Sequence, residues 1–177
     1  SKKKFELGII RNHYVGRTFI EPTQNIRSLG VKLKLSSTKT IVKNKSIILI
    51  DDSLVRGTTC HKIVKMLYES GAKEVHVRIA CPEIKYPDFY GVDMPTKGEL
   101  LAHGKDNQEM CDYIKAKSLK FLSLDGLYKA LINENRNSNY PQFSDHYFTG
   151  DYPIKPHDNL EGLKIKQLSL LSGKSNN

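Results

Sequence analysis

Residues 45–80 constrain the fold more than any other part of this 177-residue chain. They begin with a β-branched apolar run, residues 45–50, which is typical of a strand buried on both faces of a parallel sheet. A helical pattern follows over residues 60–70, Gly71 stands at the position of a helix C-cap, and residues 74–80 alternate as a second strand. This order predicts a right-handed βαβ unit that binds ligands at the carboxyl ends of its strands.

The segment that joins the first strand to the helix, residues 51–59, carries the strongest chemical signal. It reads Asp-Asp-Ser-Leu-Val-Arg-Gly-Thr-Thr. Backbone N–H groups that open a helix lie at the positive end of its dipole and form a site for a phosphate dianion. Gly57 allows the backbone to approach such a ligand closely. Three hydroxyl side chains add hydrogen-bond donors: Ser53, Thr58 and Thr59.

The two carboxylates at the start of this segment, Asp51 and Asp52, call for a different partner. No Lys stands before the threonines, so the pattern differs from the phosphate loop of nucleoside triphosphatases. Carboxylates repel phosphate, and they accept hydrogen bonds from sugar hydroxyls or hold Mg²⁺. The plain alternative is that they only cap the following turn. A ribose 5-phosphate would satisfy both halves of the segment.

The remaining chain adds shorter elements to this unit. An apolar run at residues 7–10 is a strand candidate, and another strand is expected at residues 119–122. Helical patterns are expected at residues 97–101, 107–114 and 123–133.

Two stretches of the chain lack a sustained periodicity of apolar residues. Residues 11–35 predict a long flexible loop, and loops of that length inside a domain are usually lids, binding loops or disorder. From residue 135 the chain turns polar, and residues 137–141 are typical of a linker. We therefore expect the main domain to cover residues 1–134, and a C-terminal extension with a disordered tail to cover residues 135–177.

Composition narrows the function classes only slightly. The 28 Lys and Arg against 19 Asp and Glu give a formal charge of +9, which favours nucleic acid, anionic lipid or phosphorylated small molecules as partners. Cys60, Cys81 and Cys111 form no Cys-x-x-Cys pair, so neither a disulfide framework nor a zinc ribbon is indicated. Without a membrane span or a signal peptide in this sequence, a reducing cytoplasm is the expected location.

Four motifs now point to one family. Residues 51–59 resemble the signature of type I phosphoribosyltransferases, whose acidic pair contacts the ribose and whose loop holds the 5-phosphate. Residues 12–20 (Asn-His-Tyr-Val-Gly-Arg-Thr-Phe-Ile), 86–95 and 148–153 (Phe-Thr-Gly-Asp-Tyr-Pro) accompany them. Their order resembles that of glutamine phosphoribosyl-pyrophosphate amidotransferases, and together they cover most of residues 8–153.

The resemblance implies an α/β domain with the type I phosphoribosyltransferase fold, a mainly parallel sheet flanked by helices. It implies that the glutaminase domain and the upstream strands of the sheet precede residue 1. The implied reaction forms 5-phosphoribosylamine from phosphoribosyl pyrophosphate and glutamine-derived ammonia, at the first step of de novo purine synthesis. We expect these 177 residues alone to be inactive.

The resemblance also assigns site residues. Substrate contacts are expected along the whole acidic segment, at Asp51, Asp52, Ser53, Val55, Arg56, Gly57, Thr58 and Thr59, with Mg²⁺ at Asp51 and Asp52. In the loop that closes over the substrate, Arg17 is a good diphosphate contact and Tyr14 helps to exclude water. Arg11 stands where the family usually has Lys, and it keeps the cation.

Cofactors and partners follow from the same resemblance. Some members carry an iron–sulfur cluster on cysteines at positions that hold Asp88, Ser144 and Tyr147 here, so no cluster is expected. Purine nucleotides are expected as inhibitors and a homo-oligomer as the assembly. Neither a membrane nor nucleic acid is an expected partner.

Two rival interpretations stay open. A phosphoribosyltransferase that acts on a nucleobase would share residues 51–59, but it would not be expected to share residues 14–20 and 148–153. A non-catalytic regulator of the same fold would bind phosphoribosyl pyrophosphate or DNA. Salt-sensitive binding to random DNA would favour the regulator.

Overall fold

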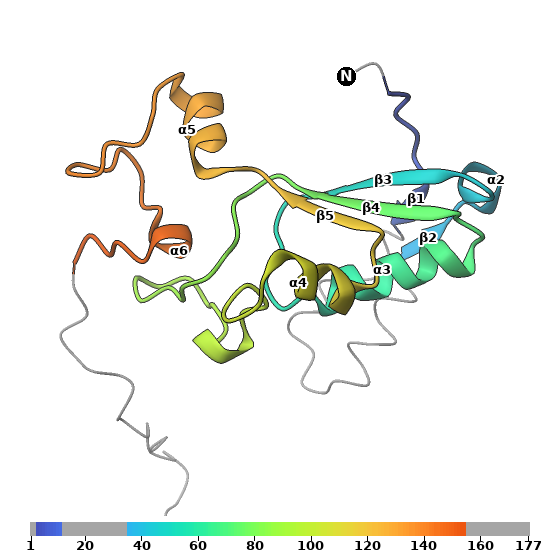
Figure 1. The fold of residues 1–177 in the computed structure, drawn as a ribbon, viewed down its shortest axis with the longest axis horizontal. Helices are drawn as coiled ribbons and strands as arrows, with labels where there is room; N and C mark the ends of the chain where they lie inside the picture. The colour runs from blue at the N-terminus through green and yellow to red at the C-terminus, as the bar shows by residue number, and fades with distance from the viewer. Residues whose placement is uncertain (1–2, 12–34, 155–177) are drawn as a thin grey trace, which may run out of the picture.

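A computed structural model describes residues 3–11 and 35–154 of the chain (Figure 1). Its larger sheet is parallel, with the order β3-β4-β5. The strands are β3 (Ser46–Asp51), β4 (Glu74–Ile79) and β5 (Ser118–Phe121). This sheet confirms the predicted α/β class and the βαβ unit, with each strand end within one or two residues of its predicted place.

Two helices cover one face of the sheet, and Figure 1 shows α3 and α4 on the same side of it. In α3 (Thr58–Glu69) the buried side chains are Cys60, Ile63, Val64 and Leu67, a spacing that forms one apolar stripe. The shorter α4 (Asn107–Ile114) begins with a capping box in which Asp106 and Glu109 accept each other's backbone N–H groups. Helix α3 packs on β4 and helix α4 packs on β5, and the two helices contact each other, so their buried side chains form the core together with those of the strands.

The other face of the sheet departs from the prediction that the first strand is buried on both sides. Side chains alternate along β3, so Ile47 and Leu49 pack against the core while Ile48 and Ile50 are 49% and 69% exposed. The prediction of two-sided burial is therefore wrong for β3 in the part of the chain that the structure describes. The apolar run was compatible with a helical layer on each face, and only one layer is present among the described residues.

A smaller antiparallel sheet precedes the parallel one. It pairs β1 (Ile9–Arg11) with β2 (Leu35–Ser37), and a short helix α2 (Lys39–Val42) follows. The strand predicted at residues 7–10 is thus shifted by one to two residues, and β2 and α2 were not predicted. Both ends of the predicted loop at residues 11–35 lie in paired strands, because Arg11 is opposite Leu35. Residues 12–34 lie outside the described part.

Short elements before and after β5 complete the described part of the chain. A 3-10 turn, η2 (Lys97–Glu99), replaces the helix predicted at residues 97–101, while α5 (Leu124–Ile132) falls within one predicted at residues 123–133. The small helix α6 (His146–Thr149) was not predicted. Among the described residues, no helix combines the length and the apolar character needed to cross a bilayer.

A group of side chains that we call the C-terminal clasp ties residues 136–151 to α5. The carboxylate of Asp145 accepts from the Tyr128 hydroxyl (2.8 Å) and from Arg136 Nε (2.5 Å), and Arg136 also reaches Asp151 (2.7 Å). Burial would raise the pKa of Asp145, but the bonds from Arg136 and Tyr128 hold it below its ordinary value. These contacts cross the domain boundary predicted at residue 134, and that boundary stays a prediction.

Candidate functional site

The predicted acidic segment lies at the carboxyl end of the parallel sheet. Asp51 is the last residue of β3 and pairs in register with Ile79, and its carbonyl accepts the N–H of Ala80 (2.9 Å). The chain then leaves the sheet and enters α3 at Thr58. We call residues 51–59 the β3–α3 loop. Its position matches the rule that parallel sheets bind ligands at the carboxyl ends of their strands.

Both carboxylates of the loop are free of cationic partners among the described residues. Asp51 is half-buried and accepts the Asp52 N–H at Oδ1 (3.1 Å), while the exposed Asp52 accepts the Ser53 hydroxyl (2.8 Å). Burial raises the pKa of Asp51, the Asp52 N–H opposes this, and the negative charge of Asp52 adds to it. A desolvated carboxylate without a cation is typical of a binding site.

Gly57 gives the loop its shape and begins the helix. It is buried, has φ +74° and stands at the N-cap of α3, where it offers no side chain to cap the first turn. A Cβ atom here would lie 2.6 Å from Leu101 Cδ2 and 3.0 Å from Tyr113 Cε1. With no acidic residue in the first turn, the positive end of the helix dipole stays uncompensated. The site therefore favours an anion.

The residues just before Gly57 are held by the segment after β4, and sequence reasoning did not connect the two segments. The Val55 carbonyl accepts the N–H of Leu101 (2.8 Å), and Arg56 Nε pairs with Glu99 Oε1 (3.2 Å). Glu99 also forms a capping box with Thr96, which lowers its pKa. The Thr-x-x-Glu spacing signals that box in the sequence, but no signal there links Glu99 to a residue 43 positions earlier.

Cys60 lies in the first turn of α3, directly behind the loop. Thiols at helix N-termini often have lowered pKa values, but burial raises the pKa of Cys60 to about 12, and the charge of Asp51 adds to this. Cys111 is also buried, whereas Cys81 is half-buried. Cys60 and Cys111 thus belong to the apolar core, and Cys81 packs against it.

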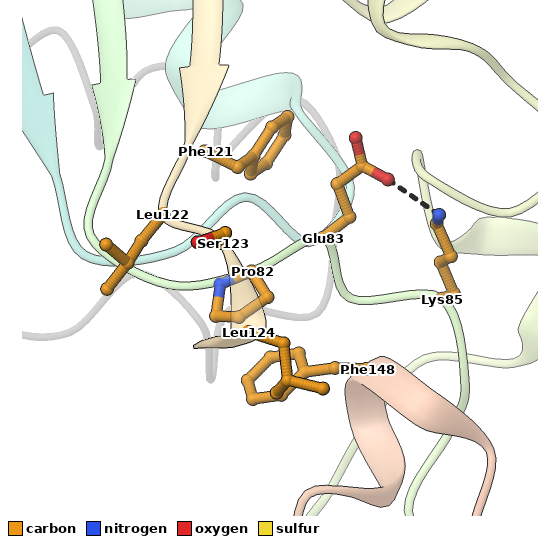
Figure 2. A pocket seen from close by; sticks show the side chains of 8 residues that line it. All are labelled: Pro82, Glu83, Lys85, Phe121, Leu122, Ser123, Leu124 and Phe148. Atoms are coloured by element: carbon orange, nitrogen blue, oxygen red, sulfur yellow. Dashed lines mark ion pairs between the residues drawn. The ribbon is translucent and has the colours of Figure 1, made fainter. Parts of the chain in front are cut away.

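A separate shallow pocket of about 300 Å³ lies at the carboxyl ends of β4 and β5. Figure 2 shows Pro82 and Glu83 from the segment after β4, Ser123 and Leu124 from the start of α5, and Phe148 from α6. Its one cation, Lys85, pairs with Glu83 at 2.7 Å. The single cation of the pocket is therefore already paired, whereas the β3–α3 loop offers an uncapped helix N-terminus to a phosphate.

The predicted lid residues cannot be placed beside this loop. Tyr14 and Arg17 lie outside the described residues, and Arg11 is described only through its backbone pairing in β1. Within residues 3–11 and 35–154, no group of three or more His, Cys, Asp or Glu side chains is arranged as a metal site. Among the described residues, the predicted Mg²⁺ contacts would thus come from the carboxylates of Asp51 and Asp52.

Of the positions compared with iron–sulfur ligands, Asp88 is the centre of a group of hydrogen bonds. Asp88 Oδ1 lies within hydrogen-bond distance of His146 Nε2 (2.8 Å), and both side chains are 1% exposed. Asp88 Oδ2 accepts the N–H groups of Tyr90 and Val92 (2.9 and 2.7 Å). Ser144 is exposed, and Tyr147 is half-buried with its ring 4.0 Å from that of His146. His146 thus serves as a buried hydrogen-bonding residue.

Comparisons with known proteins connect this geometry to one family. The chain is 56% identical over 169 residues to an amidophosphoribosyltransferase of Rhizobium etli, which covers 95% of this chain and 34% of that protein. It is 51% identical over 154 residues to an amidophosphoribosyltransferase of Staphylococcus aureus, which covers 87% of this chain and 31% of that protein. No protein-family model matches the chain.

Solved structures agree with these relatives. One is described as glutamine phosphoribosylpyrophosphate amidotransferase from B. subtilis complexed with ADP and GMP. It has a TM-score of 0.73 and 45% identity and covers 87% of this chain and 34% of that one. A structure described as the allosteric regulatory enzyme of purine biosynthesis has a TM-score of 0.74 and 46% identity. The chain belongs to the amidophosphoribosyltransferase family, with the type I phosphoribosyltransferase fold, and it spans about a third of the length of the curated relatives it matches.

Proposed function

We propose that this chain is the phosphoribosyl-pyrophosphate-binding part of an amidophosphoribosyltransferase, corresponding to the C-terminal third of such an enzyme. The observation that carries the proposal is the β3–α3 loop. It places two carboxylates without cationic partners next to an uncapped helix N-terminus at the carboxyl end of a parallel sheet. A phosphorylated sugar presents both kinds of partner, because its phosphate suits the helix and its hydroxyls suit the acids.

The two ends of the loop bind different parts of the substrate. The 5-phosphate lies against the N–H groups that follow Gly57, with the hydroxyls of Ser53, Thr58 and Thr59 as further donors. Asp51 and Asp52 accept hydrogen bonds from the ribose hydroxyls and fix the orientation of the ring. Val55 and Arg56 keep this arrangement because Leu101 and Glu99 hold them.

The reaction is a displacement at the anomeric carbon of the ribose. The lone pair of ammonia forms the new C–N bond as the C–O bond to pyrophosphate breaks, and the ammonium product then loses one proton to water. Neutral ammonia is already a nucleophile, so the loop supplies position rather than a general base. Arg17 would neutralise charge on the leaving pyrophosphate, while Tyr14 and Arg11 belong to the segment that closes over the substrate and keeps water out.

The carboxylates of the loop also fit Mg²⁺, which typically binds one or two carboxylates together with substrate phosphates. Asp51 Oδ1 and Asp52 Oδ1 each accept one hydrogen bond, which leaves a second oxygen on each residue. When bound, the ion would offset negative charge on the pyrophosphate. The protein's own part is to hold the sugar, and the cluster-free character predicted from Asp88, Ser144 and Tyr147 belongs to this proposal.

The proposal also covers nucleotide ligands, the assembly and the source of ammonia. The B. subtilis relative is described as complexed with ADP and GMP, which supports purine nucleotides as ligands of this chain's enzyme as well. We also propose a cytoplasmic homo-oligomer that receives ammonia from a glutaminase domain outside these 177 residues. Activity would require that domain, so the chain by itself would bind substrate without turning it over.

Calorimetry with phosphoribosyl pyrophosphate and Mg²⁺ tests the site. The sample is this chain, both alone and co-expressed with the part of the Rhizobium etli enzyme that it does not match. We expect Asp51→Asn/Asp52→Asn to weaken binding by about 100-fold or more, because two charged hydrogen-bond acceptors are lost. The exposed pair Asp93→Asn/Asp125→Asn, matched in charge, should leave the affinity unchanged.

Other outcomes separate the rival functions. Binding that survives the loss of Asp51 and Asp52 would contradict the assigned loop. Tight binding without ammonia-dependent formation of phosphoribosylamine in the co-expressed complex would favour a regulator. Turnover with a nucleobase in place of ammonia would indicate a nucleobase phosphoribosyltransferase.

A further inference from the structure

An exposed ion pair joins the β3–α3 loop to the turn η2. Arg56 Nε lies 3.2 Å from Glu99 Oε1, and the two side chains are 45% and 50% exposed. Ion pairs with that exposure add little to stability, and many add nothing measurable. The pair nevertheless connects the residue just before Gly57 to one that is 43 positions away in the chain. Its role is therefore better explained by the orientation of Arg56 than by stability.

Glu99 is held in place although it is exposed. Its Oε2 atom accepts both the backbone N–H of Thr96 (3.1 Å) and the Thr96 hydroxyl (3.1 Å), which leaves Oε1 for Arg56. The bonds from Thr96 and Arg56 lower the pKa of Glu99, so the carboxylate is charged at neutral pH. The buried Leu101 follows closely in the chain, and its N–H donates to the Val55 carbonyl (2.8 Å). These contacts fix the position of the carboxylate relative to the loop.

The guanidinium of Arg56 is only partly used by this pair. An arginine side chain carries five N–H donors, and Arg56 gives the one on Nε to Glu99. No other acceptor among the described residues bonds to this guanidinium, so its two terminal nitrogens keep all their donors. A planar fork of this kind can donate to two oxygens of one phosphate. The contact through Nε thus restrains the plane of the fork and leaves its outer edge for a ligand.

We propose that Glu99 is a positioning residue for phosphoribosyl pyrophosphate and that it acts through Arg56. Thr96 fixes Glu99, Glu99 orients the guanidinium, and the terminal nitrogens of Arg56 donate to the 5-phosphate. This inference rests on the proposed function, in which the N–H groups after Gly57 bind the same phosphate. Because Arg56 directly precedes Gly57 in the chain, the 5-phosphate rather than the pyrophosphate is its assigned partner.

Calorimetry with two separate probes tests the assignment, on this chain co-expressed with the part of the Rhizobium etli enzyme that it does not match. The probes are ribose 5-phosphate and inorganic pyrophosphate, each with Mg²⁺. We expect Glu99→Gln to weaken the binding of ribose 5-phosphate by about fivefold, and Arg56→Ala by about tenfold or more. Neither change should alter the binding of pyrophosphate.

The matched control is Glu69→Gln. Glu69 forms a similarly exposed pair with Lys65 at the C-terminal end of α3, away from the loop. This variant should bind both probes as the wild type does, and circular dichroism should show every variant folded. The proposal is overturned if Glu99→Gln and Glu69→Gln bind ribose 5-phosphate alike.

A double variant separates positioning from a general structural role. If Glu99 acts only through Arg56, then Arg56→Ala/Glu99→Gln should bind ribose 5-phosphate no more weakly than Arg56→Ala alone. Additive losses would show that Glu99 supports the loop in another way, and they would overturn the proposal. Weaker binding of pyrophosphate to Arg56→Ala would also overturn it, since Arg56 would then serve the leaving group.

A failure of the proposed function gives a different result. In that case the wild-type complex does not bind ribose 5-phosphate, or binds it equally well after Asp51→Asn/Asp52→Asn, and both proposals fall together. If binding depends on Asp51 and Asp52 but is the same in Glu99→Gln, the proposed function stands and only the role of Glu99 is lost.

Discussion

Two regions of the molecule use charged side chains in opposite ways. In the β3–α3 loop, Asp51 and Asp52 have no cationic partner among the described residues, and Arg56 meets Glu99 with both side chains about half exposed, at 45% and 50%. In the C-terminal clasp, Arg136 and Asp145 are 11% and 4% exposed, and Tyr128, Thr149 and Asp151 supply further hydrogen bonds.

The difference separates binding from structure. A buried charge must be paired and hydrogen-bonded within the protein, because burial without a partner costs several kcal/mol. The clasp meets that requirement internally, because Asp145 and Arg136 are bonded to each other. The loop leaves its carboxylates without a cation among the described residues and its helix N-terminus without a side-chain cap. Such a region gains its missing partners from what it binds.

The largest expected effect is on stability at the clasp. Arg136→Ala leaves the Asp145 carboxylate buried without its cation, so we expect the free energy of unfolding to fall by about 3 kcal/mol. The matched change at the loop, Arg56→Ala, removes an exposed pair and should cost no more than about 1 kcal/mol. Urea denaturation measures both. Equal losses would mean that burial does not distinguish the two regions.

The shape of the loop gives the next largest effect. Gly57→Ala should destabilise the chain by about 2 kcal/mol, because the new Cβ meets Leu101 and Tyr113 in addition to the strain of a positive φ. Gly104→Ala is the control, since Gly104 has φ +80° and no atom within 4 Å of the added Cβ. The difference between the two variants in thermal denaturation isolates the contact with Leu101 and Tyr113. Gly57→Ala should also bind phosphoribosyl pyrophosphate more weakly than the wild type, and Gly104→Ala should not.

The Asp88–His146 contact predicts a dependence of stability on pH. Burial would raise the pKa of Asp88, but the N–H of Val92, the His146 ring and the N–H of Tyr90 lower it to about 2. The unfolded value is about 4, so the contribution is present above pH ~4 and is lost as the pH falls towards 2. Asp88→Asn should flatten the acid limb of a stability-against-pH curve. The exposed Asp93→Asn should leave it as in the wild type; an unchanged limb in Asp88→Asn would argue against this assignment.

The smallest effect concerns the thiol behind the loop. Because burial raises the pKa of Cys60 to about 12, iodoacetamide at pH 8 should leave it unmodified in the folded chain and react with it in urea. Mass spectrometry of peptides measures the modification, with the half-buried Cys81 as an internal comparison. Rapid labelling of Cys60 without denaturant would show that the first turn of α3 opens to solvent.

Much of the fold could be predicted because its signals are local. Periodicity placed β3, α3, β4, α4 and α5 within about two residues of their observed bounds. The strand β2 and the helices α2 and α6 were missed because each has four residues or fewer, too short to establish a period. The predicted burial of β3 on both faces was wrong because an apolar run does not report how many layers cover it.

In the candidate site, too, the local features could be predicted from the sequence and the long-range contacts could not. The composition of residues 51–59 indicated a phosphate and sugar site, and the structure brings those residues together at the carboxyl end of β3. The supports of the loop, Glu99 and Leu101, and the partner of Asp88, His146, were not predicted. They lie 40 or more positions away in the chain, and nothing in a single sequence pairs residues at that separation.

The sequence by itself determined the parallel α/β unit and the chemistry of the loop that follows β3, because hydrophobic period, glycine conformation and side-chain type act within a few residues. Only the tertiary structure decided which charged side chains are buried against a hydrogen-bonding partner. It buried Asp145 against Arg136 and Asp88 against His146, and it left Asp51, Asp52 and Arg78 without opposite charges among the described residues. Burial and pairing depend on where distant segments meet in space, and that distribution separates the residues that hold the fold from those that await a partner.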